Sequence, residues 1–154
     1  MDQTDRKIIA ALSQNANIPH AVLAQRLDIT RQTVAARIKK LEREGTIRKY
    51  KAVIDYEKIG MRSFFILFLK MDVADQKKAA SFISTLKLDP HVLTDVSITG
   101  EWDVMLMLAF EDVKDYEEYI NVMRSKMGSM IKDIKSHVIL NFYKTPDDYV
   151  PTAV

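Results

Sequence analysis

The stretch Ala21–Gly45, AVLAQRLDITRQTVAARIKKLEREG, holds two short amphipathic segments a few residues apart. In the first segment, apolar residues at positions 22, 23 and 27 share one helical face. Asp28 tolerates a left-handed turn conformation, and Thr30 is a suitable N-cap for a second helix. That second helix has a predicted buried stripe at i, i+4 and i+7, formed by Val34, Ile38 and Leu41. Two helices joined by a tight turn predict a helix-turn-helix.

The remaining faces of the second helix are rich in cations and hydrogen-bonding side chains. In a major groove, the first turn of such a helix contacts base edges, and its later cations contact phosphates. The alternative is a basic, solvated face on an ordinary helical domain. On the first interpretation, the candidate DNA contacts are Thr30, Arg31, Gln32, Thr33, Arg37, Lys39, Lys40, Arg48 and Lys49.

Both flanks of this stretch support the DNA-reading interpretation. Upstream, residues 5–12 carry apolar side chains at helical spacing and predict a third helix of a small trihelical core. Downstream, Gly45 is expected to end the second helix. Residues 46–54 then predict a strand pair, or wing, with cations on its polar face. Together these elements predict a winged helix-turn-helix.

The distribution of charge divides the chain. Residues 1–60 carry twelve Lys and Arg against seven Asp and Glu, a net charge of +5, which leaves −3 for the rest of a chain whose total is +2. A basic head on an acidic body indicates a polyanionic partner for the head alone. The 154 residues contain no Cys, as is usual in a reducing compartment, and show no signal sequence or long apolar span. We therefore expect a cytoplasmic protein that does not bind membranes.

The second half of the chain alternates strand and helix patterns. Strands are predicted over 63–73, 92–98, 104–110 and 134–143, with helices over 79–86 and 116–127. The order strand, helix, strand, strand, helix, strand is that of the ferredoxin-like βαββαβ unit with an antiparallel sheet. The whole chain is thus predicted to be α+β.

Two strands of this half are apolar on both faces. Between Val104 and Phe110, the residues at 104, 106, 108 and 110 point one way, while Met105, Met107 and Ala109 point the other. In the first strand, the residues at 64, 66 and 68 lie on one face and those at 65, 67 and 69 on the other, and all six are apolar. Helices can cover only one of these faces, so the other is expected to be buried against a second copy of the chain. The methionines are interpreted as packing residues rather than as part of a metal or cofactor site.

Catalytic motifs are not apparent in the sequence. His20, His91 and His137 share no local ligand spacing with one another or with acids, and the four glycines do not form a phosphate-binding loop. We therefore expect no enzyme activity, no cofactor and no metal.

The pattern as a whole resembles the Lrp/AsnC (leucine-responsive, asparagine-responsive or feast/famine) family of transcription regulators. The resemblance rests on DQTDRKIIAAL near the start, the block LAQRLDITRQTVAARIKKLEREGTIRKYKAVID, the pair Ile59–Gly60 and the segment TGEWDV at 99–104. It implies an N-terminal winged helix-turn-helix, a hinge strand, and a C-terminal domain that dimerises and often assembles four dimers. It also implies amino acids or related metabolites as effectors, bound between dimers.

The resemblance also implies an effector site. Its contacts are expected at Thr99, Gly100, Trp102 and Asp103, with Ser136 on the last strand. Two features depart from the family pattern: Asp28 stands where many members have Gly, and Ile134 stands where amino-acid-binding members often have Thr or Ser. The alternative for TGEWDV is a tight turn that needs Gly100, with Trp102 as a packing residue.

The predicted organisation is a winged helix-turn-helix over 1–52, a hinge strand or linker over 53–62, an effector-binding and oligomerisation domain over 63–145, and a C-terminal tail over 146–154. The predicted function is sequence-specific binding of double-stranded operator DNA by a homodimer or octamer, modulated by an amino acid or a related small metabolite. A different class of function remains open: a metabolite sensor or small enzyme built on the ferredoxin-like domain, with the helical head binding a protein.

Overall fold

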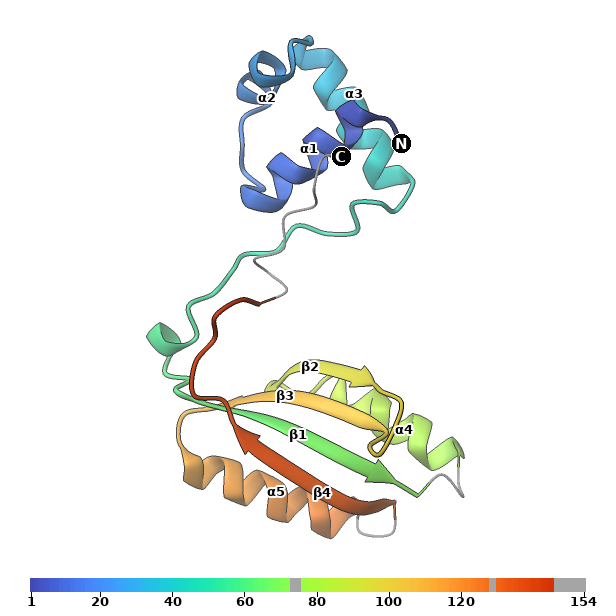
Figure 1. Cartoon of the computed structure of the whole chain (residues 1–154), viewed down its shortest axis with the longest axis vertical. Coiled ribbons are helices and arrows are strands. Elements are labelled where there is room, and N and C mark those ends of the chain that lie inside the picture. Colours follow the sequence, from blue (N-terminus) through green and yellow to red (C-terminus); the bar gives the residue numbers. More distant parts are fainter. Residues whose placement is uncertain (73–75, 128–129, 146–154) are drawn as a thin grey trace. The chain divides into compact units, whose positions relative to one another are not determined.

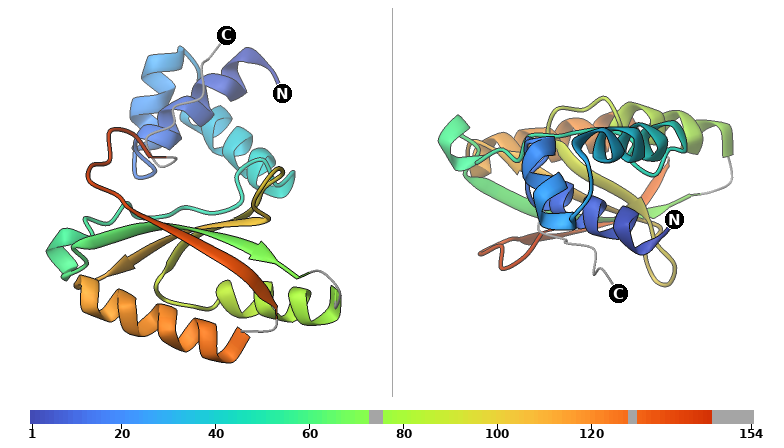
Figure 2. Two further views of the ribbon diagram at one scale, coloured as in Figure 1. Left: turned by 60° about the horizontal axis from the view of Figure 1, so that its bottom comes forward. Right: turned by 90° about the horizontal axis from the view of Figure 1, so that it is seen from above.

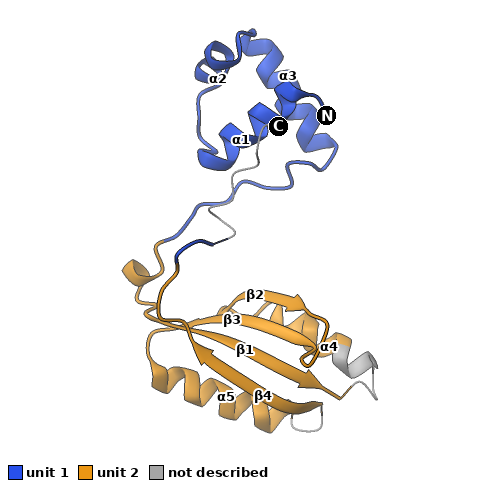
Figure 3. Cartoon of the chain, viewed as in Figure 1, with its two compact units in different colours: residues 1–54, 143–154 blue, residues 55–142 orange. Residues whose placement is uncertain are grey.

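The computed structural model describes residues 1–72, 76–127 and 130–145, with residues 76–79 described by their backbone alone. The described chain contains five α-helices, one short 3₁₀ helix and four strands (Figure 1). It divides into two compact units, one holding residues 1–54 together with Tyr143–Thr145, the other holding residues 55–142 (Figure 3). No described helix is long and apolar enough to cross a membrane.

The N-terminal unit is built on α1 (Gln3–Gln14), α2 (His20–Leu27) and α3 (Arg31–Arg43). Its core joins all three helices through buried apolar side chains: Ile8, Ile18, Leu23, Ala24, Val34, Ile38 and Leu41. The Val34, Ile38 and Leu41 stripe predicted from the sequence is therefore confirmed. The helix predicted over 5–12 forms as well, and it extends to residues 3–14.

The strand pair predicted over 46–54 is wrong. Residues 46–54 form no strand, and most of their side chains are exposed. Ile47 attaches the segment to α3, since its amide donates a 3.1 Å hydrogen bond to the Leu41 carbonyl. The sequence alternates as a strand does, but the described residues of this unit include no strand that could lie beside it and form a ladder.

The second unit is an antiparallel four-stranded sheet in the order β2-β3-β1-β4, and it confirms the predicted α+β, ferredoxin-like arrangement. Its strands are β1 (Ser63–Met71), β2 (Val92–Ser97), β3 (Val104–Phe110) and β4 (Ile131–Val138). A 3₁₀ turn, η1 (Glu57–Ile59), precedes β1. The helices α4 (Gln76–Leu86) and α5 (Val113–Met127) lie on one side of the sheet, as Figure 2 shows.

The last strand differs from its prediction at both ends. β4 begins at Ile131 rather than at residue 134, and it ends at Val138 rather than at residue 143. Its register explains the early end, because Val138 pairs with Phe65 and the Ile139 amide reaches the Phe64 carbonyl. One residue further on, β1 itself begins at Ser63, so the following chain has no strand to pair with. The tail predicted over 146–154 lies outside the described residues.

The two faces of the sheet differ in what covers them. Under α4 and α5, a core includes Phe65, Leu67, Leu106, Leu108 and Phe110. Aromatic stacking strengthens it: the Phe65 and Tyr116 rings lie 3.6 Å apart and nearly parallel. On the opposite, open face, the rings of Tyr56 and Phe142 pack edge-on against the buried Phe64. Ala109, paired with Phe64, is also buried there, whereas four larger apolar side chains of the same face are partly exposed, namely Ile66, Phe68, Met105 and Met107.

Candidate nucleic-acid interface and effector site

The turn between α2 and α3 has the conformation expected of Asp28. This residue adopts the left-handed conformation, with φ 53° and ψ 48°, at the end of α2. Ile29 follows, donates its amide to the Ala24 carbonyl at 3.1 Å, and packs against the helical core. The Thr30 hydroxyl then accepts the Thr33 amide at 3.1 Å and caps α3. This turn therefore fixes where α3 starts.

The face of α3 opposite its buried stripe is the candidate DNA surface. With a helical repeat of about 3.6 residues per turn, Gln32, Lys39 and Arg43 lie on that side. All three side chains are exposed, as is the small Ala36 between them. Arg31 and Lys40 flank this stripe and are also exposed. Positions four and eleven residues after Gln32 add Ala36 and Arg43, which are not among the nine DNA contacts predicted from the sequence.

Two threonines at the start of α3 are hydrogen-bonded to each other through their hydroxyl groups. The hydroxyl oxygens of Thr30 and Thr33 lie 2.8 Å apart. The Thr30 oxygen also caps the helix, so its contribution is to the geometry of the first turn. Gln32, whose side chain takes part in no such bond among those described, is the first-turn residue with amide groups available to a base edge.

Arg37 has a different environment from the other cations of α3. Its Nη1 donates 2.7 Å hydrogen bonds to Asp2 Oδ2 and to the buried Asp5 Oδ1. Asp2 and Asp5 also form a reciprocal capping box at the start of α1. The pKa of Asp5 is lowered because hydrogen bonds from Arg37 and the Asp2 amide outweigh the opposing effect of burial. The guanidinium thus joins α3 to the N-terminal end of α1.

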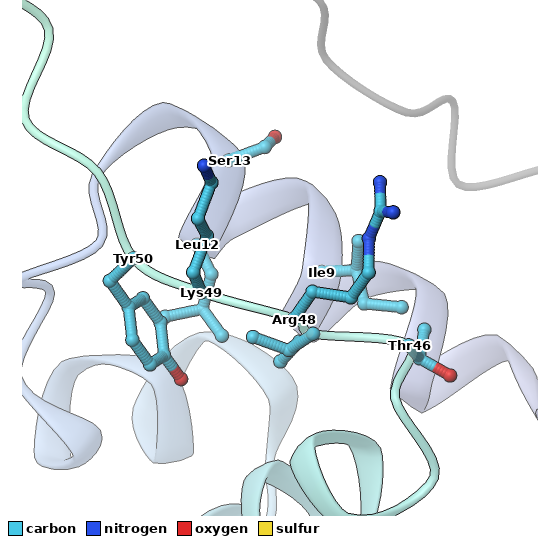
Figure 4. Close-up of a pocket in the computed structure, with 8 residues that line it drawn as sticks. Ile9, Leu12, Ser13, Thr46, Arg48, Lys49 and Tyr50 are labelled. Carbon is cyan, nitrogen blue, oxygen red and sulfur yellow. The ribbon is translucent and has the colours of Figure 1, made fainter. Parts of the chain in front are cut away.

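A further basic segment follows α3. Figure 4 shows Arg48 and Lys49 on the extended stretch that runs beside α1. Tyr50 attaches this stretch to α3 through a 2.7 Å hydrogen bond from its hydroxyl to Glu42 Oε1. Burial, and then the bond to the Glu42 carboxylate, raise the pKa of Tyr50 to about 12. Arg48 and Lys49 are both exposed and lie between two anchored residues, Ile47 and Tyr50.

The candidate effector residues 99–103 form the turn between β2 and β3. Gly100 has φ +114°, a conformation that side-chain-bearing residues rarely adopt. Asp103 holds the turn against β1: its Oδ2 accepts the Met71 amide at 2.8 Å, and its Oδ1 lies 3.7 Å from Lys70 Nζ. Trp102 turns toward the open face of the sheet, where its ring lies 6.2 Å from that of Phe68.

Ser136 lies apart from this turn. It pairs with Leu67 in the β1–β4 ladder and therefore faces the helices, whereas Trp102 lies beside Phe68 on the open face. Ser136 lines a surface hollow of about 400 Å³ with Tyr116, Asn121 and Arg124 of α5. A single chain does not bring the five candidate effector residues into one pocket.

Among the described residues, no three His, Asp or Glu side chains gather closely enough to hold a metal ion. The most perturbed tyrosine of the second unit, Tyr119, donates a 3.0 Å hydrogen bond to Asp89 Oδ2. Burial, and then the adjacent carboxylate, raise its pKa. This pair joins α5 to the loop before β2 on the helix-covered side of the sheet.

Two family models match the chain. Residues 1–48 match a model described as winged helix-turn-helix DNA-binding, and residues 65–148 match the Lrp/AsnC ligand binding domain. An HTH-type transcriptional regulator of Pyrococcus horikoshii is 31% identical over 79% of this chain and 80% of its own length. The proline dehydrogenase transcriptional activator of Rhodobacter capsulatus is 28% identical over 84% of this chain and 82% of its own.

A solved structure shows the same fold. The transcriptional regulator of Neisseria meningitidis in complex with L-Met superposes with a TM-score of 0.86, at 23% identity, over 94% of this chain and 93% of the other. The second family model alone spans more than half of the sequence, in agreement with the resemblance noted above. The chain belongs to the Lrp/AsnC family of DNA-binding transcriptional regulators.

Proposed function

We propose that this regulator binds operator DNA by inserting α3 into the major groove. In this arrangement Arg31 and Gln32 contact base edges, while Lys39, Lys40 and Arg43 contact phosphates, as do Arg48 and Lys49 on the following segment. Ala36 permits close approach at the middle of the helix. Arg37 is assigned instead to the structure of the domain, because its Nη1 is bonded to two carboxylates of the same unit, Asp2 and Asp5.

The observation that carries this proposal is the exposed stripe of α3. Apart from the small Ala36, its side chains are cationic or amide-bearing, and all of them are exposed, while the opposite stripe is buried in the helical core. The capped first turn, with its base-reading residues, is rigidly placed by the Asp28 turn and the Thr30 cap. Pre-organised first turns of this kind are what a major-groove reader requires.

Selection of binding sites from fragmented genomic DNA tests the proposal directly, followed by affinity measurements on the selected site across a range of salt concentrations. If a dimer makes on the order of six to ten phosphate contacts, affinity should fall about 10³- to 10⁵-fold between ~50 and ~200 mM salt. A salt-independent affinity, or selection of no common sequence, would contradict the proposal. It would favour the protein-binding alternative for the helical head.

The proposed oligomer uses the open face of the sheet. Ile66, Phe68, Met105 and Met107 present partly exposed apolar surface there, and α4 and α5 occupy only the other face. A second copy placed by a two-fold axis would cover this surface with its own equivalent. Further assembly of such dimers, up to an octamer, is part of the same proposal.

We assign the effector to a site shared by two copies. Trp102 and Ser136 lie on opposite faces of the sheet, so a pocket containing both needs residues from more than one chain. In this proposal Asp103 offers a carboxylate to an ammonium group, and backbone amides of the exposed turn at Gly100 bind a carboxylate. The N. meningitidis regulator bound to L-Met supports an amino acid as the ligand class.

A further inference from the structure

The N-terminal unit contains a groove that the proposed DNA contacts only partly explain. It lies between the C-terminal half of α1 and the extended stretch at 46–50, and has a volume of about 570 Å³ (Figure 4). Ile9 and Leu12 of α1 form its apolar floor together with Ile47. Ser13 and Thr46 lie among the lining residues and are exposed.

The rim of this groove is positively charged. Arg48 and Lys49 are both exposed lining residues, and no lining residue is acidic. In Figure 4 both side chains extend to the same side of the stretch as Ser13 of α1. The groove therefore combines an apolar floor with two cations at its edge, which suits an extended peptide carrying acidic and apolar side chains in succession.

The sequence contains one such peptide next to this unit. Residues 146–154 read PDDYVPTAV, in which two acids, Asp147 and Asp148, precede Tyr149 and Val150. This segment lies outside the described residues. Tyr143–Thr145, which lead into it, belong to the same compact unit as α1 and the 46–50 stretch. Nine residues of extended chain span up to about 30 Å, which is enough to cross a small domain.

We propose that the segment 146–154 docks in this groove of its own chain, with Asp147 and Asp148 beside Arg48 and Lys49, and Tyr149 on the floor formed by Ile9 and Leu12. The assignment rests on two features: the two acids are complementary in charge to the two cations of the rim, and the apolar pair Tyr149 and Val150 follows the acids. One consequence rests on the proposed function: because DNA phosphates and the tail acids bind the same two cations, the docked tail lowers DNA affinity. The segment is then a built-in competitor of operator DNA.

Cysteine trapping tests the docking without any reference to DNA. The native chain has no Cys, so the pair Ser13→Cys and Tyr149→Cys can form only the engineered bonds. The matched control is Ser84→Cys with Tyr149→Cys, because Ser84 is also an exposed helical serine, on α4. A disulfide needs Cα atoms within about 7 Å, so proximity decides which pair oxidises.

The expected result is rapid formation of an intrachain disulfide in the Ser13 pair and slow formation in the Ser84 pair. Non-reducing electrophoresis separates this product from an interchain dimer. Predominant interchain bonding through Ser13 would overturn the proposal, since the occupant would then be the tail of a second copy. Equal rates for the two pairs would also overturn it, because the groove would have no preference for the tail.

Affinity for the selected operator tests the competition. In the full chain, Asp147→Asn with Asp148→Asn should raise DNA affinity about three- to tenfold at low salt, as expected for the release of two exposed ion pairs. The same change in an Arg48→Gln, Lys49→Gln background should have no effect. Unchanged affinity in the native background would overturn the competition. Efficient trapping in a protein that binds no DNA would instead contradict the proposed function and leave the docking supported.

Discussion

The guanidinium of Arg37 in α3 lies 2.7 Å from the carboxylate of Asp5, the buried acid of α1. Asp2 adds a second carboxylate at the same distance. Arg37 is a cation on the proposed recognition helix, as a phosphate contact would be, but its two ion pairs hold α3 against the start of α1. The orientation of the proposed recognition helix therefore depends on the first five residues of the chain.

We expect Arg37→Gln to lower the thermal stability of the protein by several degrees while leaving the salt dependence of DNA affinity unchanged. The variant leaves the buried Asp5 carboxylate without its charged partner, which is strongly unfavourable. It removes no cation available to phosphate, since the two carboxylates already neutralise Arg37. Lys39→Gln is the matched control, with the opposite expectation: unchanged melting temperature and a smaller salt slope. If DNA affinity depended less steeply on salt concentration in Arg37→Gln than in the wild type, Arg37 would itself be a DNA contact.

The same cluster predicts a pH dependence. The pKa of Asp2 is lowered by hydrogen bonds from the Asp5 amide and Arg37, and the pKa of Asp5 is lowered as well. Acids with depressed folded-state pKa values stabilise the protein above their unfolded pKa of 3.8, and this contribution is lost as the pH falls through the folded values. The difference in melting temperature between wild type and Arg37→Gln should thus be constant from pH 7 to about 5 and narrow below 3.8. A difference that persists at pH 2 would contradict this assignment.

The elements that the sequence predicted well are those with a local signal. Val34, Ile38 and Leu41 are spaced for a buried helical stripe, and the strand over Val104–Phe110 appears with its predicted bounds. Thr30 caps α3 as its residue type suggested. The errors arose where a neighbouring strand determines whether a segment forms a strand and where that strand ends. An alternating pattern at 46–54 forms no strand without a neighbour, and β4 ends where β1 runs out.

The candidate sites show the same division. Exposure of Arg31, Gln32 and Lys39 follows from helical periodicity and could be predicted. The ion pairs of Arg37 with Asp2 and Asp5 could not be predicted, because these acids are 35 and 32 residues away from it in the sequence. The separation of Ser136 from the turn at Gly100 likewise depends on strand register, which fixes the face of the sheet on which each side chain lies.

Base reading by α3 predicts different effects for two of its residues. Gln32→Ala should relax the operator preference at one position per half-site by roughly 1–3 kcal/mol, because an amide that pairs with a base edge is lost. Lys40→Ala should weaken binding to all sequences alike, since a phosphate contact carries no base information. Binding-site selection with each variant measures both effects. Identical selected profiles for the two variants would be incompatible with this docking of α3.

The open sheet face predicts the assembly. Met107→Glu places a carboxylate at the centre of the proposed dimer contact, where burial without a partner is heavily penalised. We expect the variant to dissociate or to aggregate, as measured by sedimentation velocity over a dilution series. Ser84→Glu on the exposed side of α4 adds the same charge away from that face and should leave the assembly unchanged. An intact oligomer of the Met107 variant at low concentration would rule out this face as the interface.

The effector site predicts a loss of regulation without a loss of DNA binding. Asp103→Asn keeps a side-chain oxygen to accept the Met71 amide, so the turn between β2 and β3 should stay in place, but it removes the charge offered to an ammonium group. Calorimetric titration with a panel of amino acids that includes L-Met should therefore show binding to the wild type and none to the variant. Lys70→Gln is the control, because it breaks the exposed ion pair with Asp103 and keeps the Asp103 charge. Since a ligand changes DNA affinity only through unequal affinity for two states, the ligand that binds the wild type should also change its operator affinity. Binding of that ligand by Asp103→Asn with wild-type affinity would assign Asp103 to the fold of the turn alone.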